Sequence, residues 1–318
     1  MRKIAYFFLY SITYNFKSAG FTSITPHMPP KKFPVIAFIS LLLGGIAIGF
    51  AGILMRLSDV NPLASAFWRM ALAAPVLWCW AFAVRKQDRL NDKRVHFSKV
   101  LLLAGIFFAA DMGNWHLSLH YTTVSNATLL SNFAPIFIAL WMWRVHKMQF
   151  ARMFMVGMGI ALVGAIMLIG PNASLGSDKL LGDGLGLGTA IFYAGYMLMI
   201  KDARYQYSTA RLMAWSTTVT ATLLLPFALI MSGPFWPAAS AGWITLLSLA
   251  LVAQIGGQTL ITYAFAHLPA TLSSVSLLIQ PLTATIAAWI IFHEYISPLQ
   301  MAGGALLLCG IYLSKRGS

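Results

Sequence analysis

The residues best suited to chemistry lie in a stretch that is otherwise apolar, FFAADMGNWHLSLH at positions 107–120. Its carboxylate, Asp111, can exchange a proton or hold a cation, whereas Arg69, in the preceding apolar stretch, can hold an anion but cannot deprotonate. Two histidines, His116 and His120, have the spacing of two metal ligands on a helix, but no second cluster would complete the ligand set. We therefore expect no metal site and no cofactor, and the question becomes what the two charged residues do.

The composition places these polar residues in a membrane. Of 318 residues, 59% are hydrophobic and 9% are charged, whereas roughly 25% of the residues in an average soluble domain are charged. Ten apolar stretches have about the length that a helix needs to cross the hydrocarbon core. We predict an all-α integral membrane protein with ten transmembrane helices, at 33–56, 61–84, 98–121, 122–144, 151–170, 180–201, 209–232, 243–267, 270–292 and 297–314.

The basic residues indicate the orientation of these helices. Nearly all Lys and Arg residues lie in the terminal segments and in the alternate loops on one side, whereas Arg56 and Lys179 lie on the other side. The positive-inside rule then predicts a multi-pass protein of the bacterial inner membrane with both termini in the cytoplasm. The net charge of +14 comes from the basic residues that set the topology and that face anionic lipid head groups. We therefore expect no nucleic-acid partner.

Residues 1–32 do not fit this pattern, because they combine a basic start and a short apolar core with the polar run PHMPPKK. No small-residue cleavage site follows the apolar core, which argues against a removed signal peptide. We expect a cytoplasmic or interfacial segment, and a start of the protein at Met28 is the alternative.

An internal repeat organises the ten helices. At an offset of 146 residues the sequence pairs Pro135 with Pro281, Trp143 with Trp289, Gly157 with Gly303 and Gly164 with Gly310. A similar offset pairs FAG at 50–52 with YAG at 193–195. Because five helices are an odd number, the second unit must be inverted relative to the first, which is the basis of alternating access. We predict inverted five-helix units at 33–170 and 180–314.

Three segments resemble the EamA family of the drug/metabolite transporter superfamily. They are NPLASAFWRMALAAP at 61–75, YTTVSNATLLSNFAPIFIALW at 121–141 and FHEYISPLQMAGGALLLCGIYL at 292–313. The resemblance implies ten helices, cytoplasmic termini and efflux of small metabolites, often amino acids. It also implies a glutamate before the last helix of each unit. Glu294 is this residue in the second unit, but the offset places Met148 at the equivalent position of the first.

Arg69 and Asp111 are predicted at similar depths in neighbouring spans, so we expect them to face each other. A neutralising ion pair between two helices explains this arrangement, and so does a switchable pair that contacts solute or exchanges a proton. Helical periodicity places Asn114, Trp115 and Ser118 on the face of Asp111, and the two histidines on the other side.

Further polar groups at membrane depth predict a cavity between the two units. Hydrogen bonds between helices explain any single amide, but amides at one depth in both units favour a polar cavity. Prolines beside two of these amides leave the carbonyls of Ser131 and Leu277 without their helical partners. The predicted cavity residues are Asn132, Gln254, Gln258, Gln280, Tyr193 and Tyr196, and the predicted helix breaks are Pro135 and Pro281.

These patterns predict a transporter and exclude several other classes. No nucleophile–base pair and no phosphate-binding motif is present, and the glycines of GDGLGLG and GGIAIGFAG are typical of close helix packing. We predict a secondary transporter that exports small metabolites, above all amino acids, by alternating access, with the proton as candidate coupling ion. A broad exporter of drugs or toxic compounds is one alternative, and a membrane sensor or scaffold that moves no solute is another.

Overall fold

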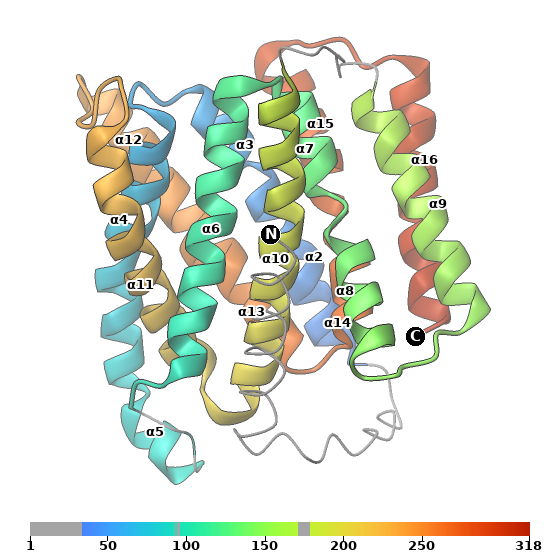
Figure 1. Cartoon of the computed structure of the whole chain (residues 1–318), viewed down its shortest axis with the longest axis horizontal. Helices are drawn as coiled ribbons and strands as arrows, with labels where there is room; N and C mark the ends of the chain where they lie inside the picture. Colours follow the sequence, from blue (N-terminus) through green and yellow to red (C-terminus); the bar gives the residue numbers. More distant parts are fainter. Residues whose placement is uncertain (1–33, 92, 94–95, 171–178) are drawn as a thin grey trace, which may run out of the picture. The chain divides into compact units, whose positions relative to one another are not determined.

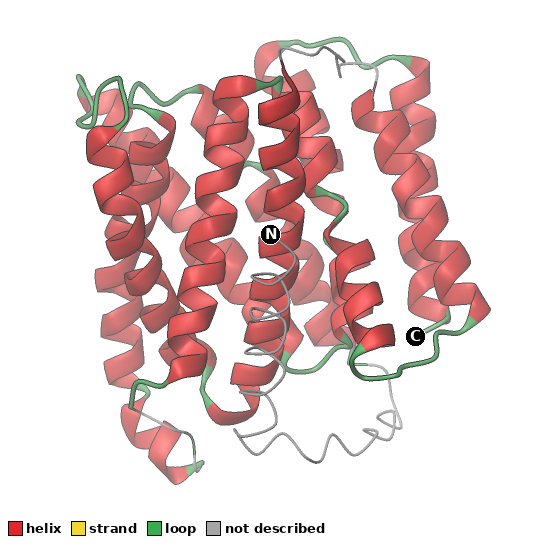
Figure 2. Cartoon of the chain, in the orientation of Figure 1, coloured by secondary structure: helices red, strands yellow, loops and turns green. Residues whose placement is uncertain are grey.

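The structure is a computed structural model that describes residues 34–91, 93, 96–170 and 179–318, so the predicted segment 1–32 lies outside the described residues. All regular elements of the described residues are helices (Figure 2). In chain order they are α2 (Val35–Gly49), α3 (Ala51–Arg56), α4 (Pro62–Ala83), α5 (Arg85–Leu90), α6 (Lys99–Tyr121), α7 (Val124–Ser131), α8 (Ala134–Arg144), α9 (Arg152–Ile169), α10 (Leu180–Gln206), α11 (Thr209–Ile230), α12 (Ser240–Ser248), the π-helix η3 (Leu249–Gln258), α13 (Thr259–Phe265), α14 (Ala270–Ser276), α15 (Ile279–Phe292) and α16 (Pro298–Arg316).

The ten predicted spans correspond to helices or to broken helices (Figure 1). Among the described residues, eight helical segments are long and apolar enough to cross a membrane. The other two predicted spans are the interrupted pair α7 and α8, and α16, which has Gln300 in its first turn and Lys315 in its last turn. The predicted class, an all-helical membrane protein, is confirmed.

The last helices of the two units, α9 and α16, pack against each other in opposite directions (Figure 1). A Cβ atom built on Gly157 would lie 2.9 Å from the Gly310 carbonyl oxygen, and one built on Gly164 would lie 2.7 Å from the Gly303 carbonyl oxygen. Repeat-related glycines therefore meet crosswise, as a two-fold axis in the membrane plane requires. The contact supports the predicted inverted repeat and leaves no room for a side chain at the crossing.

The fourth and ninth spans are both broken at repeat-related positions. The first break separates α7 from α8, which has Pro135 in its first turn, and the second separates α14 from α15, which contains Pro281. The Leu277 carbonyl accepts a hydrogen bond from the Gln280 N–H at 3.0 Å. The prediction of a free acceptor at Leu277 is therefore wrong. Pro281 has no N–H to donate to this carbonyl, but the N–H of the preceding residue reaches it in a tight turn.

Glycines also bring the two units together, as the GGIAIGFAG pattern indicates. A Cβ on Gly44 would lie 2.7 Å from the Gly257 carbonyl oxygen, and one on Gly49 would lie 2.6 Å from Thr283 Cβ. The GDGLGLG segment lies in α10, where Gly182 packs on Thr122. Both segments are confirmed as small-residue packing surfaces.

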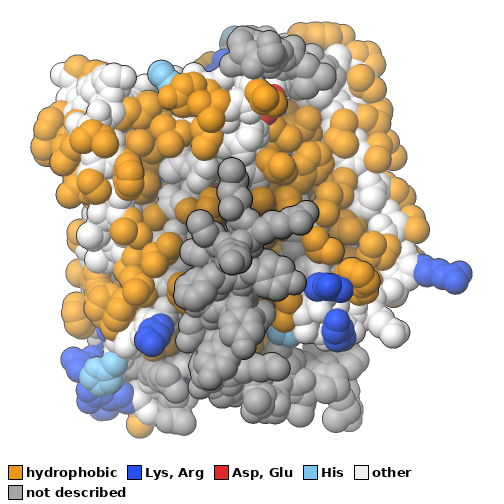
Figure 3. Space-filling model, viewed as in Figure 1, with side chains coloured by type: hydrophobic (Ala, Val, Ile, Leu, Met, Phe, Trp, Pro, Cys, Tyr) orange, Lys and Arg blue, Asp and Glu red, His pale blue; other side chains and the backbone are white. Residues whose placement is uncertain are grey.

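The surface matches a helical bundle in lipid. On the face in Figure 3, hydrophobic side chains cover a broad area, and Lys and Arg side chains gather toward the end that carries α5 and the C-terminus. The helix α5 lies where the sequence predicted only a loop. Its buried Asp88 accepts a hydrogen bond from the Ser208 hydroxyl at 2.8 Å, which ties α5 to the start of α11.

Candidate functional site

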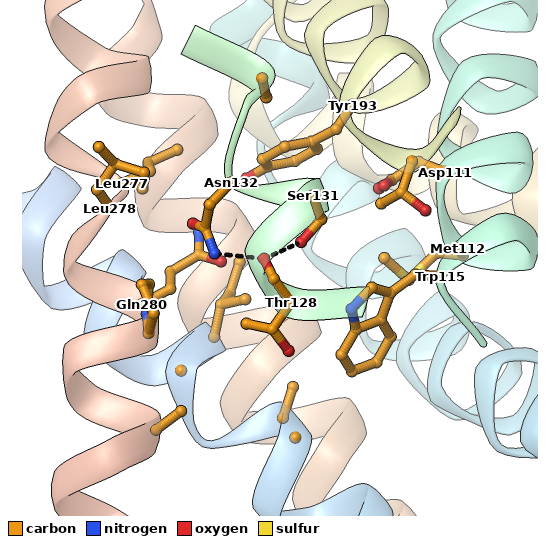
Figure 4. Close-up of a pocket in the computed structure, with 18 of the residues that line it drawn as sticks. Asp111, Met112, Trp115, Thr128, Ser131, Asn132, Tyr193, Leu277, Leu278 and Gln280 are labelled. Atoms are coloured by element: carbon orange, nitrogen blue, oxygen red, sulfur yellow. Dashed lines mark hydrogen bonds between the residues drawn. The ribbon is translucent and has the colours of Figure 1, made fainter. Parts of the chain in front are cut away.

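A cavity of about 130 Å³ lies between the two units (Figure 4). Its walls come from α2, α3, α4, α6, α10 and η3 and from both broken spans. In Figure 4, Asp111 and Trp115 lie on one side of the cavity, and Leu277, Leu278 and Gln280 lie on the opposite side. Its polar lining residues are Arg69, Asp111, Thr128, Ser131, Asn132, Thr189, Tyr193, Gln258, Ser274 and Gln280.

Two buried charges of opposite sign line this cavity. Arg69 is 3% exposed and Asp111 is 2% exposed. Both belong to the described residues, and they form no direct ion pair there, although they interact electrostatically. Arg69 Nη1 instead lies 3.8 Å from Met112 Sδ, while Arg69 Nε and Asp111 Oδ2 have no hydrogen-bond partner. Arg69 and Asp111 therefore do not form the neutralising ion pair that is one of the two explanations of their predicted placement, and each retains a polar atom without a hydrogen-bond partner.

Further polar atoms of the cavity wall also lack hydrogen-bond partners. The Tyr193 hydroxyl lies near the Gln280 amide, but neither the hydroxyl nor Gln280 Nε2 meets hydrogen-bond geometry with a partner. At the break in the fourth span, Asn132 Nδ2 and the Ser131 hydroxyl both donate to the Thr128 carbonyl, at 2.6 Å and 2.8 Å (Figure 4). The break is thus held by its own side chains, and the tyrosine and glutamine retain free polar atoms.

A second layer supports this wall. Tyr196 is fully buried behind the lining, where its ring stacks on Phe108 with the centroids 4.2 Å apart. Gln258 lines the cavity, and its Nε2 donates to the Tyr196 hydroxyl at 3.2 Å. Tyr196 was expected in the cavity itself, but its position makes it a support for Phe108 and Gln258.

Two other predicted cavity residues point elsewhere. Asn114 donates to the carbonyl of Ala110 in its own helix at 2.7 Å and lies beside Gly188 of α10. Gln254 donates to the Thr217 hydroxyl of α11 at 2.9 Å. Both predictions are wrong because neighbouring helices, α10 and α11, cover these faces.

The other polar residues of the opening sequence stretch also have helix neighbours or solvent around them. Ser118 donates to the Gly182 carbonyl of α10 at 2.9 Å, so it too lies outside the cavity. His116 is buried, and its Nδ1 lies 2.7 Å from the Met112 carbonyl oxygen, whereas His120 is exposed. Among the described residues, no three side chains of metal-ligating type gather into a site.

A second cavity of about 310 Å³, the vestibule, adjoins the first and shares Gly52, Trp115, Thr128, Pro281 and Ala284 with it. The ion pair of Arg56 Nη1 and Glu294 Oε1, 2.7 Å apart, lies in the vestibule wall. Sequence patterns did not predict the side chains of Arg56, Thr128, Ser131 or Ser274 as binding groups, because an arginine at the end of a span and hydroxyls in a helix are common. The prolines that mark the helix breaks are the one signal near these hydroxyls.

Comparisons with known proteins show the family and the fold of the chain. The chain matches the EamA-like transporter family over residues 35–170 and 180–316. An uncharacterized transporter of Archaeoglobus fulgidus is 26% identical over 296 residues, which cover 90% of this chain and 98% of the relative. The pseudopaline exporter CntI of Pseudomonas aeruginosa is 24% identical over 209 residues, which cover 66% of this chain and 72% of the relative. A solved crystal structure with 16% identity has a TM-score of 0.72 and covers 89% of this chain and 96% of that chain, so the two share a fold.

Proposed function

Because the chain belongs to the EamA-like transporter family, we propose that it exports small zwitterionic metabolites, above all amino acids, from the bacterial cytoplasm by alternating access. The family membership makes it a multi-pass membrane transporter of small molecules and not an enzyme.

The proposed solute class rests on one observation: Arg69 and Asp111 are both buried, both line the cavity and are not paired with each other. An uncompensated charge at membrane depth is costly, which favours a ligand that neutralises both. An amino acid has the complementary groups, because its carboxylate suits the guanidinium of Arg69 and its ammonium suits the carboxylate of Asp111. Apolar neighbours such as Phe108, Met112 and Trp115 suit an uncharged side chain.

The two inverted units support alternating access. Both contribute walls to the cavity, and both contain a broken span beside it. When the units exchange conformations, the same cavity opens to the other side of the membrane. The end that carries α5 and the C-terminus is rich in Lys and Arg, so we place that end and both chain termini in the cytoplasm.

Two observations bear on the breadth of specificity. Cavities for drug-sized molecules typically measure about 300 to 1,000 Å³, and the central cavity measures about 130 Å³. A small solute therefore fits this conformation better than a large drug does. One relative is named as a pseudopaline exporter, which supports export of a metabolite as the activity.

Counterflow in proteoliposomes tests the proposal. Vesicles are loaded with one unlabelled amino acid, and uptake of the same labelled compound is followed for glycine, L-alanine, L-leucine, L-methionine and L-phenylalanine. We expect transient accumulation of at least one of them, and loss of accumulation in Arg69→Gln and Asp111→Asn. Saturable binding without counterflow for the whole set would indicate a sensor, and counterflow of uncharged aromatic drugs alone would indicate a broad exporter.

A repeat of the assay with an imposed pH gradient tests the proton as coupling ion. A net driven uptake that follows the gradient supports proton exchange, and counterflow that ignores the gradient supports facilitated movement.

A further inference from the structure

The vestibule is the larger of the two adjoining cavities, at about 310 Å³ against about 130 Å³. The two share Trp115 and Pro281 as common walls, so a solute that leaves the centre toward the end of α3 enters the vestibule. Its other walls include Ser125, Thr285 and Gln300. The vestibule thus has polar groups and room for a whole small solute.

The vestibule contains the same charged chemistry as the centre, one guanidinium and one carboxylate. Here Arg56 and Glu294 pair with each other, and the Arg56 guanidinium also lies over the Phe292 ring, 4.5 Å from its centroid. The two side chains are 46% and 44% exposed. An ion pair this accessible to water contributes little net stability, so a solute can separate it at small cost.

We propose that the vestibule is a second binding site for the transported zwitterion, with the solute carboxylate on Arg56 and its ammonium on Glu294. This inference rests on the proposed function and extends it to the exit path. In the empty vestibule the two residues neutralise each other, and a solute inserts between them and replaces one ion pair by two. In the central cavity Arg69 and Asp111 are already apart, so no pair has to be broken there.

Among the described residues, the repeat-related positions carry this charge pair at one end of the bundle only. The loops before α9 and α16 have the same backbone geometry, since Met148 N donates to Met142 O and Glu294 N donates to Ala288 O. The inverted repeat therefore places Met148 at the opposite end in the position of Glu294. At the offset that aligns FAG with YAG, Met199 corresponds to Arg56. Both partners are uncharged in the counterpart, so the inverted repeat provides no equivalent charge pair at the opposite end of the bundle.

Protection of an introduced thiol tests the site directly. The background carries Cys79→Ala and Cys309→Ala, which remove the two native cysteines, and Ser125→Cys places one thiol in the vestibule. The purified protein reacts with a cationic methanethiosulfonate reagent with and without each of the five amino acids used for counterflow. With solute at ten times its dissociation constant, labelling should slow about tenfold.

Variants separate the vestibule from the centre. Arg56→Gln and Glu294→Gln should each remove the protection, and Arg56→Lys should retain part of it because the charge remains. Asp111→Asn, which disables the central site, should leave the protection in place. Thr285→Cys provides a second thiol position if Ser125→Cys does not fold.

The outcomes distinguish this inference from the proposed function. Protection that survives Arg56→Gln and Glu294→Gln but disappears in Asp111→Asn would overturn the second site and leave central binding intact. Protection that follows Arg56 and Glu294 without any counterflow supports the vestibule site and refutes transport. Absence of both protection and counterflow for all five amino acids refutes both.

Discussion

Lys147 and His293, 146 residues apart, have the same left-handed backbone conformation, with φ angles of 54° and 55°. Each follows the end of a repeat-related helix, α8 or α15. The inverted repeat therefore extends to the turn that ends each broken span. The residue that follows is Met148 in one unit and Glu294 in the other. The same backbone turn therefore carries an apolar side chain at one end of the bundle and a carboxylate at the other.

These two turns make a prediction about stability. A left-handed conformation costs a residue with a Cβ atom about 1 to 2 kcal/mol relative to the right-handed one, and glycine avoids this cost. We expect His293→Gly and Lys147→Gly each to raise the thermal midpoint of the detergent-solubilised protein. His293→Ala and Lys147→Ala are the matched controls, because alanine keeps the Cβ atom and should give no increase. Equal effects of glycine and alanine would contradict the strain argument.

The crossing of α9 and α16 predicts a difference between two glycines of one helix. In Gly164→Ala the new methyl group would collide with the backbone nitrogen of Leu307, whereas Gly159 has nothing within 4 Å. Overpacking typically costs about 1 to 3 kcal/mol, so Gly164→Ala should lower the thermal midpoint and the yield of folded protein. Gly159→Ala should be neutral or slightly stabilising, because alanine favours helix. Similar midpoints for the two variants would show that this contact is not tight.

Asp111 supplies a prediction for transport. Asparagine keeps the size and polarity of the side chain but removes its charge and its ability to exchange a proton. Asp111→Asn should reduce counterflow to the background while the protein remains in the membrane at the wild-type level. Asp59→Asn is the control, because Asp59 lies in a loop, where Oδ2 accepts from Ala238 N, and not in the cavity wall. Full activity of Asp111→Asn would exclude a role of the charge in transport.

Two glutamines of η3 form a matched pair for the cavity itself. Gln258 lines the cavity, whereas Gln254, four residues earlier and equally buried, bonds to Thr217. Gln258→Leu should weaken solute binding roughly fivefold to tenfold, the effect of about 1 to 1.5 kcal/mol expected for one hydrogen bond. Gln254→Leu should lower stability without a change in the dissociation constant. Equilibrium binding of labelled solute and thermal unfolding of the same samples separate the two effects.

Much of the architecture could be predicted from particular residues. Long apolar stretches predicted the spans because a bilayer demands about 20 apolar residues per helix. The pairs Gly157 and Gly303, and Gly164 and Gly310, predicted an inverted repeat, and these glycines meet where the two units cross. The break at Pro135 was predictable because proline removes a helical hydrogen bond.

The cavity was predictable only in part. Of the residues named from the sequence, those that line the cavity are Arg69, Asp111, Trp115, Asn132, Tyr193, Gln258 and Gln280. Helical periodicity gives the relative directions of side chains on one helix, but it does not say which neighbour each direction meets. Asn114 and Trp115 are adjacent in sequence, yet α10 covers the first and the cavity receives the second.

The sequence by itself determined the class, the inverted repeat and the presence of two charges in apolar helices, because these depend on residue type and on spacing along the chain. Only the tertiary structure decided that Arg69 and Asp111 share a cavity without pairing, and that Arg56 pairs with Glu294 across 238 residues. Such contacts depend on how helices from different parts of the chain pack, and helix packing is set by the fit of whole surfaces rather than by any single residue.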